Sequence, residues 1–231
     1  MTNHVQTIEM LRAADWARGL SDEEFGRVRA ETVDRFYSAG EVICRKSSLA
    51  THWIGVVEGM LKVDILSADG RSTTLSGTSM GGWLGEGSVL KREHRPYEVA
   101  ALRDSRVALV PSHTFHYLLE NNLAFCHFMI KQLNARVGQF IALAESYRMH
   151  DLSSRVAHCL AELFNPQLNP HTDPILQISQ EEIGRLAGIS RQHAHRALHE
   201  LEDAGLVCIA YGSIGVVNID GLRAYAREHS E

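Results

Sequence analysis

Residues 178–207 read ISQEEIGRLAGISRQHAHRALHELEDAGLV, and this stretch is the most informative about how the C-terminal part of the chain folds. Ser179 and Glu182 have the spacing of a capping box, and the apolar residues that follow recur at helical spacing. Gly188 can adopt the positive φ of a tight turn, and Ser190 can cap a second helix. The stretch therefore predicts two short amphipathic helices joined by a turn, the arrangement of a helix-turn-helix.

The second predicted helix has two faces of different chemistry. Its inner face is apolar and consists of Ala194, Ala197, Leu198 and Leu201. Its outer face, together with its cap, carries the side chains that we expect to contact DNA: Ser190, Arg191, Gln192, His195, Arg196 and His199. Arg can bind guanine through two hydrogen bonds, Gln can bind adenine, and Arg or a protonated His can contact phosphate. An ordinary surface helix also has a polar face, but here the caps, the turn and the polar stripe all favour a DNA-binding helix-turn-helix.

A β-hairpin is expected after the second helix, because residues 206–209 and 215–219 are rich in strand-forming residues and flank a turn at 211–213. A hairpin in this place would be the wing of a winged helix. Residues 177–231 hold five Arg, no Lys and eight Asp or Glu, a formal balance of −3. DNA-binding domains usually carry a basic surface. We therefore expect weak nonspecific DNA binding and a need for two copies of the domain.

The composition is that of a soluble protein with room for two modest domains: 231 residues, 45% hydrophobic, with a net charge of −5. No apolar run approaches the ~20 residues of a membrane helix, and the N-terminus lacks the pattern of a signal peptide, so we expect a cytoplasmic protein with no membrane partner. The four cysteines are far apart in the sequence, which favours reduced thiols and no iron–sulfur or thiolate zinc site. They are Cys44, Cys126, Cys159 and Cys208.

The N-terminal half changes its periodicity near Phe36. Residues 4–36 are expected to be helical, with a capping box at Ser21. From there to about Pro111 short alternating segments are separated by glycine turns, including a hairpin with its turn at residues 69–70. This pattern predicts a compact all-β roll or barrel.

A long helix over residues 123–149, about 40 Å in length, is predicted next. Along it, apolar residues repeat at steps of four and three, as in the seam of a coiled coil. These residues are Cys126, Ile130, Leu133, Val137, Phe140, Ala144 and Tyr147. Packing of this stripe on its own domain is the alternative, but the strict period favours a partner helix of similar length, and we infer a homodimer. Asp151 is the expected cap of the next helix and marks a hinge, and residues 165–174 are expected to form a loop between helices.

The chain resembles the Crp/Fnr family of bacterial transcription regulators from about residue 22 to 219. The resemblance rests on segments that occur in the family's order and spacing: Gly40-Glu41, Gly59-Met60-Leu61-Lys62-Val63, Asp69-Gly70-Arg71, Gly85-Glu86 with Ser88 and Leu90, and IGRLAGISRQHAHRAL in the helix-turn-helix. It implies an α+β fold with a jelly-roll-like double-stranded β-roll of the cyclic-nucleotide-binding type (1–121), a dimerisation helix (122–150) and a winged helix-turn-helix (151–231). It also implies a homodimer in which an effector at the roll repositions the recognition helices.

The effector expected from this resemblance is a cyclic nucleotide, but the pattern for cyclic AMP is incomplete. The segment matching Gly85 and Glu86 holds the ribose and phosphate in relatives that bind cyclic AMP, and Arg95 matches the arginine that neutralises the phosphate. Pro96 stands where Ser, Thr or Ala is usual, and Phe140 and Ile141 stand where the cyclic-AMP receptor places Thr and Ser against adenine. We therefore expect Glu86 and Arg95 to form a structural ion pair and DNA binding to need no cyclic AMP. The effector stays unassigned.

Some members of the family sense through an iron–sulfur cluster or a haem instead of a cyclic nucleotide. The iron–sulfur branch needs a cluster of N-terminal cysteines, whereas the first cysteine here is Cys44, so no such cluster is expected. Haem or redox sensing stays open.

At the DNA surface, the resemblance assigns Arg191, Gln192 and Arg196 as the main readers of a pseudo-palindromic site with half-sites ~34 Å apart. Because Gln192 stands where Glu is frequent, the preferred base at one position should differ from that of the cyclic-AMP receptor. RNA polymerase is a candidate partner. An effector-binding or scaffold module without DNA binding is the alternative. A cupin-like metalloenzyme is disfavoured: His193-x-His195 has the wrong flanking spacing, and no H-E-x-x-H, phosphate loop or nucleophile elbow is present, so we expect neither catalysis nor a metal.

Overall fold

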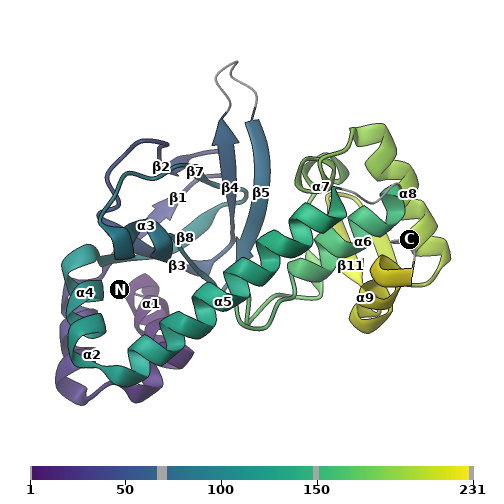
Figure 1. The fold of residues 1–231 in the computed structure, drawn as a ribbon. Helices are drawn as coiled ribbons and strands as arrows, with labels where there is room; N and C mark the ends of the chain where they lie inside the picture. Colours follow the sequence, from purple (N-terminus) through teal and green to yellow (C-terminus); the bar gives the residue numbers. More distant parts are fainter. Residues whose placement is uncertain (1, 67–71, 148–150, 229–231) are drawn as a thin grey trace.

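The computed structural model describes residues 2–66, 72–147 and 151–228 (Figure 1). The chain opens with helix α1 (Thr2–Ala13), the short 3-10 helix η1 (Asp15–Gly19) and helix α2 (Asp22–Glu31). The predicted capping box is present: the Ser21 side chain accepts from the Glu24 backbone, and Glu24 accepts from the Ser21 backbone. The prediction that the helical part extends to residue 36 is wrong. Residues 33–36 are extended because they pair with strand residues 106–109, at least 70 positions away in the sequence.

A β-roll follows, as the sequence predicted. Its strands in the described residues are β1 (Val33–Tyr37), β2 (Val42–Cys44), β3 (His52–Glu58), β4 (Met60–Leu66), β5 (Ser72–Ser79), β6 (Trp83–Leu84), β7 (Glu98–Ala101) and β8 (Ser105–Pro111), with helix α3 (Glu86–Lys91) after β6. They pair as two antiparallel four-stranded sheets, in the orders β1-β8-β3-β6 and β2-β7-β4-β5. The apolar side chains between the sheets form the roll's core.

The hairpin that the sequence predicted between β4 and β5 is present, with Met60 opposite Ser79 and Leu66 opposite Ser72. Its predicted turn at residues 69–70 lies outside the described residues. The two strands lie at the edge of the roll nearest the C-terminal half (Figure 1).

Helix α4 (Ser112–Asn121) leads into the long helix α5 (Leu123–Ser146). Asn122 caps α5 by accepting a hydrogen bond from the Phe125 backbone at 2.9 Å. The 24 residues of α5 span about 36 Å, close to the predicted length of about 40 Å. The N-terminal end of α5 packs on an aromatic cluster in which Trp16, Trp53 and Phe125 are at most 1% exposed. This packing fixes the direction of α5, which runs past the roll to the C-terminal half (Figure 1).

The C-terminal half is a winged helix. It contains α6 (Leu152–Glu162), β9 (Ile175–Leu176), α7 (Gln180–Ala187), α8 (Arg191–Asp203), β10 (Val207–Ala210), β11 (Ser213–Val216) and α9 (Ile219–Glu228). Asp151 caps α6 through the Ser153 and Ser154 backbone, as predicted. In the described residues the strands form a sheet in the order β10-β11-β9.

Three details of this half differ from the prediction. Ser213 belongs to β11 rather than to the turn, because it pairs with Ala210 across the hairpin. The segment 165–174 leads to β9 rather than directly to a helix, and β9 is a strand through the pairing of Leu176 with Ile214. Ile219 begins α9 rather than ending a strand, because the Asn218 side chain before it accepts a hydrogen bond of 2.8 Å from the Gly221 backbone.

The two halves are docked on one another by apolar and polar contacts. Met60 and Leu102 of the roll belong to the apolar core of the winged helix. Arg103, in the loop before β8, donates two hydrogen bonds to the Glu182 carboxylate of α7, at 2.7 and 2.5 Å. The Ser79 backbone donates to the Asn169 side chain at 2.9 Å. The position of the helix-turn-helix is therefore tied to the roll.

Candidate DNA-binding surface and effector pocket

The helix-turn-helix is shaped by the local interactions that the sequence predicted. The Ser179 backbone donates to Glu182 at 2.8 Å, and the Glu182 backbone donates to the Ser179 hydroxyl at 3.3 Å. Gly188 has a φ of +66°, in the left-handed region that favours glycine. The Ser190 hydroxyl accepts from the His193 backbone at 3.3 Å and so caps α8. These contacts set the angle between α7 and α8.

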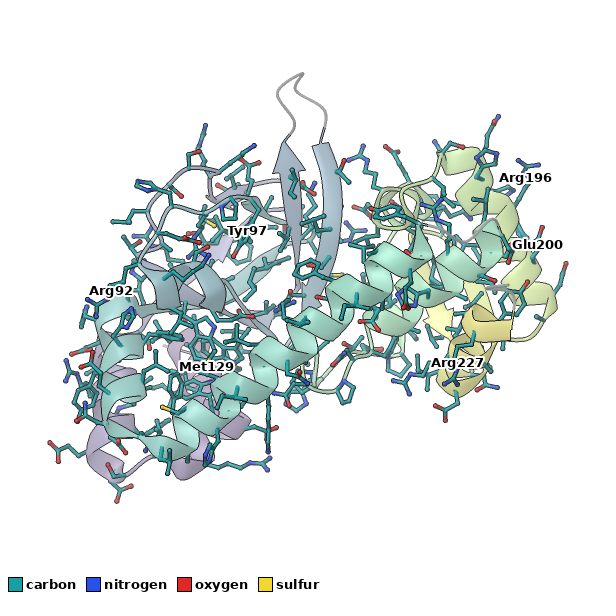
Figure 2. All side chains as sticks on the ribbon, viewed as in Figure 1. Arg92, Tyr97, Met129, Arg196, Glu200 and Arg227 are labelled. Carbon is teal, nitrogen blue, oxygen red and sulfur yellow. The ribbon has the colours of Figure 1, made fainter. Side chains whose placement is uncertain are left out.

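The inner face of α8 is buried and its outer face is in solvent. The four predicted inner residues, Ala194, Ala197, Leu198 and Leu201, are at most 2% exposed. The predicted DNA-contacting residues Ser190, Arg191, Gln192, His195, Arg196 and His199 are all exposed. Figure 2 shows Arg196 on the outer side of the winged helix, pointing away from the rest of the chain. The structure therefore brings the six predicted residues together on one accessible surface.

Within this surface the side chains differ in their partners. His195 contacts the Gln180 side chain at 3.0 Å, and His199 contacts Glu202 at 3.2 Å. No ion pair to Arg191 or Arg196 is present among the described residues. Their guanidinium groups, with the Gln192 amide beside them, can therefore turn toward base edges or phosphate without first breaking an internal contact.

The turn between β10 and β11 adds an exposed aromatic residue that the sequence had not assigned to a site. Tyr211 is fully exposed, and Gly212 beside it has a φ of +72°. The hairpin is held against the recognition helix by a hydrogen bond of 2.7 Å from the Ile209 backbone to Glu202 on α8. The sequence did contain a signal for this residue, because Tyr211 precedes Gly212 in the predicted turn of the hairpin.

Of the predicted effector residues of the roll, Gly85 and Glu86 lie at the start of α3, and Arg95 follows that helix and packs against Gly85. Gly85 has a φ of +88°, and a Cβ on it would come within 2.5 Å of Arg95 Nη1. Arg95 is 2% exposed, and its Nη2 donates to the His52 carbonyl at 2.5 Å. Nη1 of Arg95 is buried and has no hydrogen-bond partner in the described residues. A glycine at 85 is thus required both by its backbone angle and by the arginine packed against it.

The predicted ion pair between Glu86 and Arg95 is wrong. Glu86 is 3% exposed, and its Oε1 accepts from Arg136 Nε on α5 at 3.2 Å. Its second oxygen is buried without a partner in the described residues. Arg136 also donates to the Trp83 carbonyl at 3.0 Å. Arg136 supplies the charge because the side of α5 on which it lies faces the roll, whereas Arg95 is turned toward Gly85 and His52.

Sequence reasoning missed Arg136, although a signal existed. Arg136 lies one helical turn before Phe140 and follows the register of the buried residues of α5. Those buried residues are Phe125, Met129, Gln132, Gln139 and Ser146. An arginine in such a stripe needs a carboxylate partner, and Glu86 is that partner.

The predicted seam of α5 is not the face that packs on the chain's own roll. Each seam position follows a position of the inward-facing stripe by one residue, so the two stripes lie side by side. Ile130, Val137, Phe140 and Tyr147 are 64%, 56%, 41% and 45% exposed, Ala144 is exposed, and Cys126 and Leu133 are half-buried. Two more apolar side chains, Leu123 and Ile141, are 71% and 55% exposed. The inward-facing stripe is apolar at Phe125 and Met129 and polar from Gln132 onward, whereas most of the apolar seam faces outward.

Three predicted positions lie toward the C-terminal end of α5. Phe140 and Ile141, which were expected near the effector, are 41% and 55% exposed in the single chain. Tyr147 stacks on the Arg155 guanidinium, 5.3 Å from its ring centre, and Arg155 donates to the Ala187 carbonyl at 2.7 Å. The end of α5 is thereby connected to the turn of the helix-turn-helix.

The buried thiols are poor nucleophiles. Burial raises the pKa of Cys44, and burial raises the pKa of Cys159 to about 12. A thiol with a raised pKa holds little thiolate near neutral pH, and thiolate is the reactive form.

His193 and His195 lie on α8, in helix rather than strand, as the sequence predicted. Among residues 2–66, 72–147 and 151–228, no helix is long and apolar enough to cross a membrane.

Comparison with known proteins identifies both halves. Residues 34–122 match the model of the cyclic nucleotide-binding domain, and residues 154–225 match the model of the Crp-like helix-turn-helix domain. The cyclic AMP receptor protein of Thermus thermophilus is 25% identical over 198 residues, which cover 86% of this chain and 90% of that protein. The cAMP-activated global transcriptional regulator Vfr of Pseudomonas aeruginosa is 26% identical over 75% of this chain and 84% of its own length.

Solved structures share the fold at lower sequence identity. FixK2 from Bradyrhizobium japonicum superposes with a TM-score of 0.68 at 19% identity, covering 84% of this chain and 96% of that one. A CRP/FNR family transcriptional regulator from Thermus thermophilus has a TM-score of 0.62 at 22% identity, covering 85% of this chain and all of that one. The order of roll, long helix and winged helix is therefore common to these proteins.

Proposed function

The chain belongs to the Crp/Fnr family of DNA-binding transcription regulators, and on that premise we propose that it binds a pseudo-palindromic DNA site as a homodimer, with α8 of each copy in the major groove. The observation that carries the proposal is the exposed outer face of α8, on which Arg191, Gln192 and Arg196 lie together without an internal ion pair in the described residues. We further propose that the roll (1–121), the dimer helix (122–150) and the winged helix (151–231) divide sensing, pairing and DNA binding among them.

Base reading follows from the chemistry of these side chains. An arginine that forks onto guanine O6 and N7, or a glutamine that pairs with adenine N6 and N7, contributes about 1–3 kcal/mol of discrimination against the wrong base. Ser190, His195 and His199 flank the readers and suit phosphate contacts, which position the helix without reading sequence. The two half-sites should lie ~34 Å apart, one turn of the double helix.

The apolar outer stripe of α5 supports the homodimer. An exposed row of Ile130, Val137 and Phe140 on a 24-residue helix would be costly in water, and a second copy of the helix would cover it. Pairing also offsets the acidic balance of the winged helix, because two weakly attracted domains held together bind a two-part site far better than one.

The roll supports effector binding through two unsatisfied buried groups. The second oxygen of Glu86 can accept a hydrogen bond, and Nη1 of Arg95 beside Gly85 can donate one to an anion. This donor set fits a ligand that carries a hydroxyl and a negative charge. Because Pro96, Phe140 and Ile141 offer none of the polar groups that hold adenine in cyclic-AMP binders, we propose that DNA binding does not require cyclic AMP. We also propose that the protein acts in the cytoplasm and that RNA polymerase is a partner.

The test begins with selection of a consensus site from random DNA by the full-length protein. Binding to that site is then measured by fluorescence anisotropy with the unmodified protein and with Arg191→Ala, and Asp22→Asn on the distant helix α2 is the control. Arg191→Ala should weaken binding at least tenfold and the control should not. Recovery of no consensus would favour an effector-binding or scaffold module. A gain of tenfold or more on adding cyclic AMP would refute independence from that nucleotide.

A further inference from the structure

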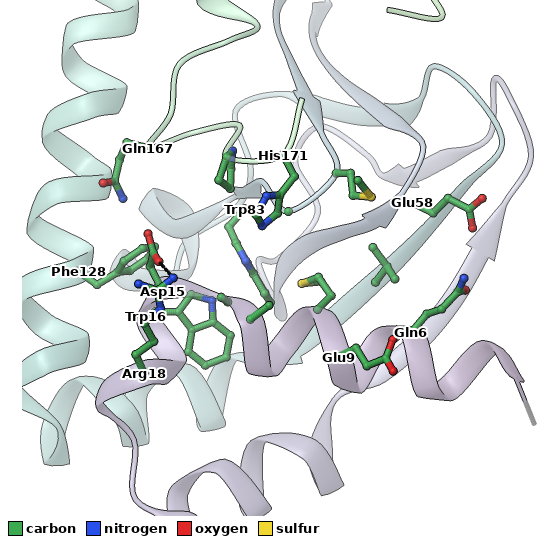
Figure 3. Close-up of a pocket in the computed structure, with 17 residues that line it drawn as sticks. Gln6, Glu9, Asp15, Trp16, Arg18, Glu58, Trp83, Phe128, Gln167 and His171 are labelled. Carbon is green, nitrogen blue, oxygen red and sulfur yellow. Dashed lines mark ion pairs between the residues drawn. The ribbon is translucent and has the colours of Figure 1, made fainter. Parts of the chain in front are cut away.

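A cavity of about 500 Å³ lies outside the roll, where four parts of the chain meet (Figure 3). One wall is formed by α1 and η1, and the second by β3 and the residues around β6. Phe128 on α5 forms the third wall, and the segment 167–171, which belongs to the connection from α6 to β9, forms the fourth. The volume is within the range of ordinary small-molecule sites. Gly85, Glu86, Arg95 and Arg136, the residues described above at the candidate effector site, do not line it.

The walls of the cavity are held in place by specific contacts. On α1, the Thr7 hydroxyl donates to the Asp34 carboxylate of β1 at 2.8 Å. The segment 167–171 is anchored to α5 by a hydrogen bond of 3.3 Å from Gln167 to Gln132. His171 packs on Gly81, where a Cβ would come within 2.5 Å of its ring. The cavity is therefore largely preformed, which lowers the cost of binding a ligand.

The floor of the cavity is apolar and aromatic. Trp16 and Trp83 are 1% and 3% exposed, and their rings meet edge to face with centres 5.2 Å apart. Each indole N–H is buried and has no hydrogen-bond partner among the described residues. Val57, Met10 and Phe128 are also part of the apolar lining. Such a floor suits the hydrocarbon or aromatic body of a ligand.

The rim of the cavity carries unbalanced negative charge. Asp15 is paired with Arg18 at 3.0 Å. Glu9 and Glu58 also line the cavity, and within the described residues neither has an ion-pair partner. Figure 3 shows both glutamates with Gln6 on one side of the cavity, opposite Phe128 and the Asp15–Arg18 pair. An anion such as a nucleotide would be repelled here, whereas a cation would be attracted.

We propose that this cavity binds a small amphipathic cation, an amine whose apolar body lies over Trp83 and Met10 and whose ammonium group faces Glu9 and Glu58. Because the segment 167–171 is one wall, a bound amine contacts both halves of the chain at once. It therefore stabilises the arrangement in which the winged helix is docked on the roll, since a ligand favours the state to which it binds better. The proposal does not depend on DNA binding.

The intrinsic fluorescence of the protein reports on the site directly. The chain has three tryptophans, Trp16, Trp53 and Trp83, and all lie in the cluster beneath the cavity. The full-length protein is titrated with 4-phenylbutylamine, with the neutral 4-phenyl-1-butanol and with the anionic 4-phenylbutyrate, which share one apolar body. We expect a saturable change with the amine at millimolar concentration, a weaker effect with the alcohol and none with the butyrate. Equal binding of amine and butyrate, or no saturable change with the amine, would overturn the proposal.

Two variants separate charge from shape. The double variant Glu9→Gln with Glu58→Gln should weaken amine binding about three- to tenfold, as expected for losing two partly exposed ionic contacts, and leave alcohol binding unchanged. The matched control, Asp22→Asn with Glu23→Gln on α2, removes the same charge elsewhere and should change neither. An equal effect of both double variants would mean that only net charge matters and would refute the assigned site.

Filling the cavity tests its location. Ala13→Phe places a ring into the space from α1 and should abolish binding of both the amine and the alcohol, with circular dichroism verifying that the variant is folded. Backbone hydrogen exchange over residues 167–171 should slow at least threefold in the presence of saturating amine. Unchanged binding by Ala13→Phe, or unchanged exchange in this segment, would refute the placement.

Discussion

The ion pair between Arg103 and Glu182 offers a sharp test of how the two halves hold one another. It joins the loop before β8 to the first helix of the helix-turn-helix through two hydrogen bonds of 2.7 and 2.5 Å. The side chains are 31% and 21% exposed, so water screens the pair only in part. We expect Arg103→Ala to loosen the docked winged helix and to lower the free energy of unfolding.

The magnitude follows from the pKa of Glu182. Burial alone would raise it, but hydrogen bonds from Arg103 and from Ser179 outweigh burial and lower the pKa from 4.5 to about 2. A fall of this size corresponds to about 3 kcal/mol of preference for the ionised carboxylate. Arg103 supplies part of this preference through its hydrogen bonds and its charge, Ser179 supplies another part, and partial exposure reduces the share of Arg103. Arg103→Ala should therefore cost about 1–2 kcal/mol at pH 7.

The pH dependence has a definite sign. Because the pKa of Glu182 is lower in the folded protein, the stabilisation is fully present above pH 4.5 and is lost as the pH falls toward 2. The difference between the unmodified protein and Arg103→Ala should thus be largest near neutral pH and shrink in acid. Urea unfolding followed by circular dichroism, at one fixed protein concentration, measures it.

The control is a surface ion pair of the same charge type. Arg185 and Glu181 of α7 are 58% and 51% exposed and 2.6 Å apart, so Arg185→Ala should change stability by less than about 0.5 kcal/mol. A double-mutant cycle with Glu182→Gln should give a coupling of at least about 0.5 kcal/mol. If Arg103→Ala costs no more than Arg185→Ala, or if the effects of Arg103→Ala and Glu182→Gln simply add, the reasoning fails.

Three further predictions concern the recognition helix, the dimer and the roll. Gln192→Glu should change the preferred base at one position of each half-site, measured by selection from random DNA, and an unaltered consensus would refute the assigned register. Val137→Glu should convert the dimer into a monomer in analytical ultracentrifugation, because it places a charge in the apolar seam, whereas Lys131→Glu on a solvent face should not; a persistent dimer would contradict the seam. Gly85→Ala should destabilise the roll by about 1–3 kcal/mol in urea unfolding, because of its φ of +88° and the contact with an arginine, whereas Gly87→Ala, with open space around it, should not; equal effects would refute this account.

The secondary structure of the helix-turn-helix could be predicted because its determinants are local. The capping box at Ser179, the left-handed Gly188 and the Ser190 cap each act over a few residues of the chain. The inner face of α8 followed from helical spacing alone. For the same reason, the seam of α5 was identifiable as a continuous apolar stripe. That this stripe faces away from the roll could not be predicted from the helix alone, because it depends on how the neighbouring elements pack against α5.

Predictions that depended on distant partners were less successful. Residues 33–36 were expected to be helical, but they pair with β8, and β9 exists only because Leu176 pairs with Ile214. The partner of Glu86 was expected nearby in the sequence and is instead Arg136, 50 residues away on α5. A short sequence window contains none of these pairings.

Spacing along single elements was sufficient to predict the long helix, the two helices of the helix-turn-helix and the hairpin after them. It also predicted the start of the recognition helix and the side chains on its outer face, because those properties depend on one element at a time. The ion pairs between distant residues and the position of the cavity depended on the folded chain as a whole. Glu86 met Arg136 rather than Arg95, Glu182 met Arg103, and the connection from α6 to β9 closed a cavity over Trp16 and Trp83. These outcomes depend on the relative positions of elements far apart in the chain, which only the packing of the two halves fixes.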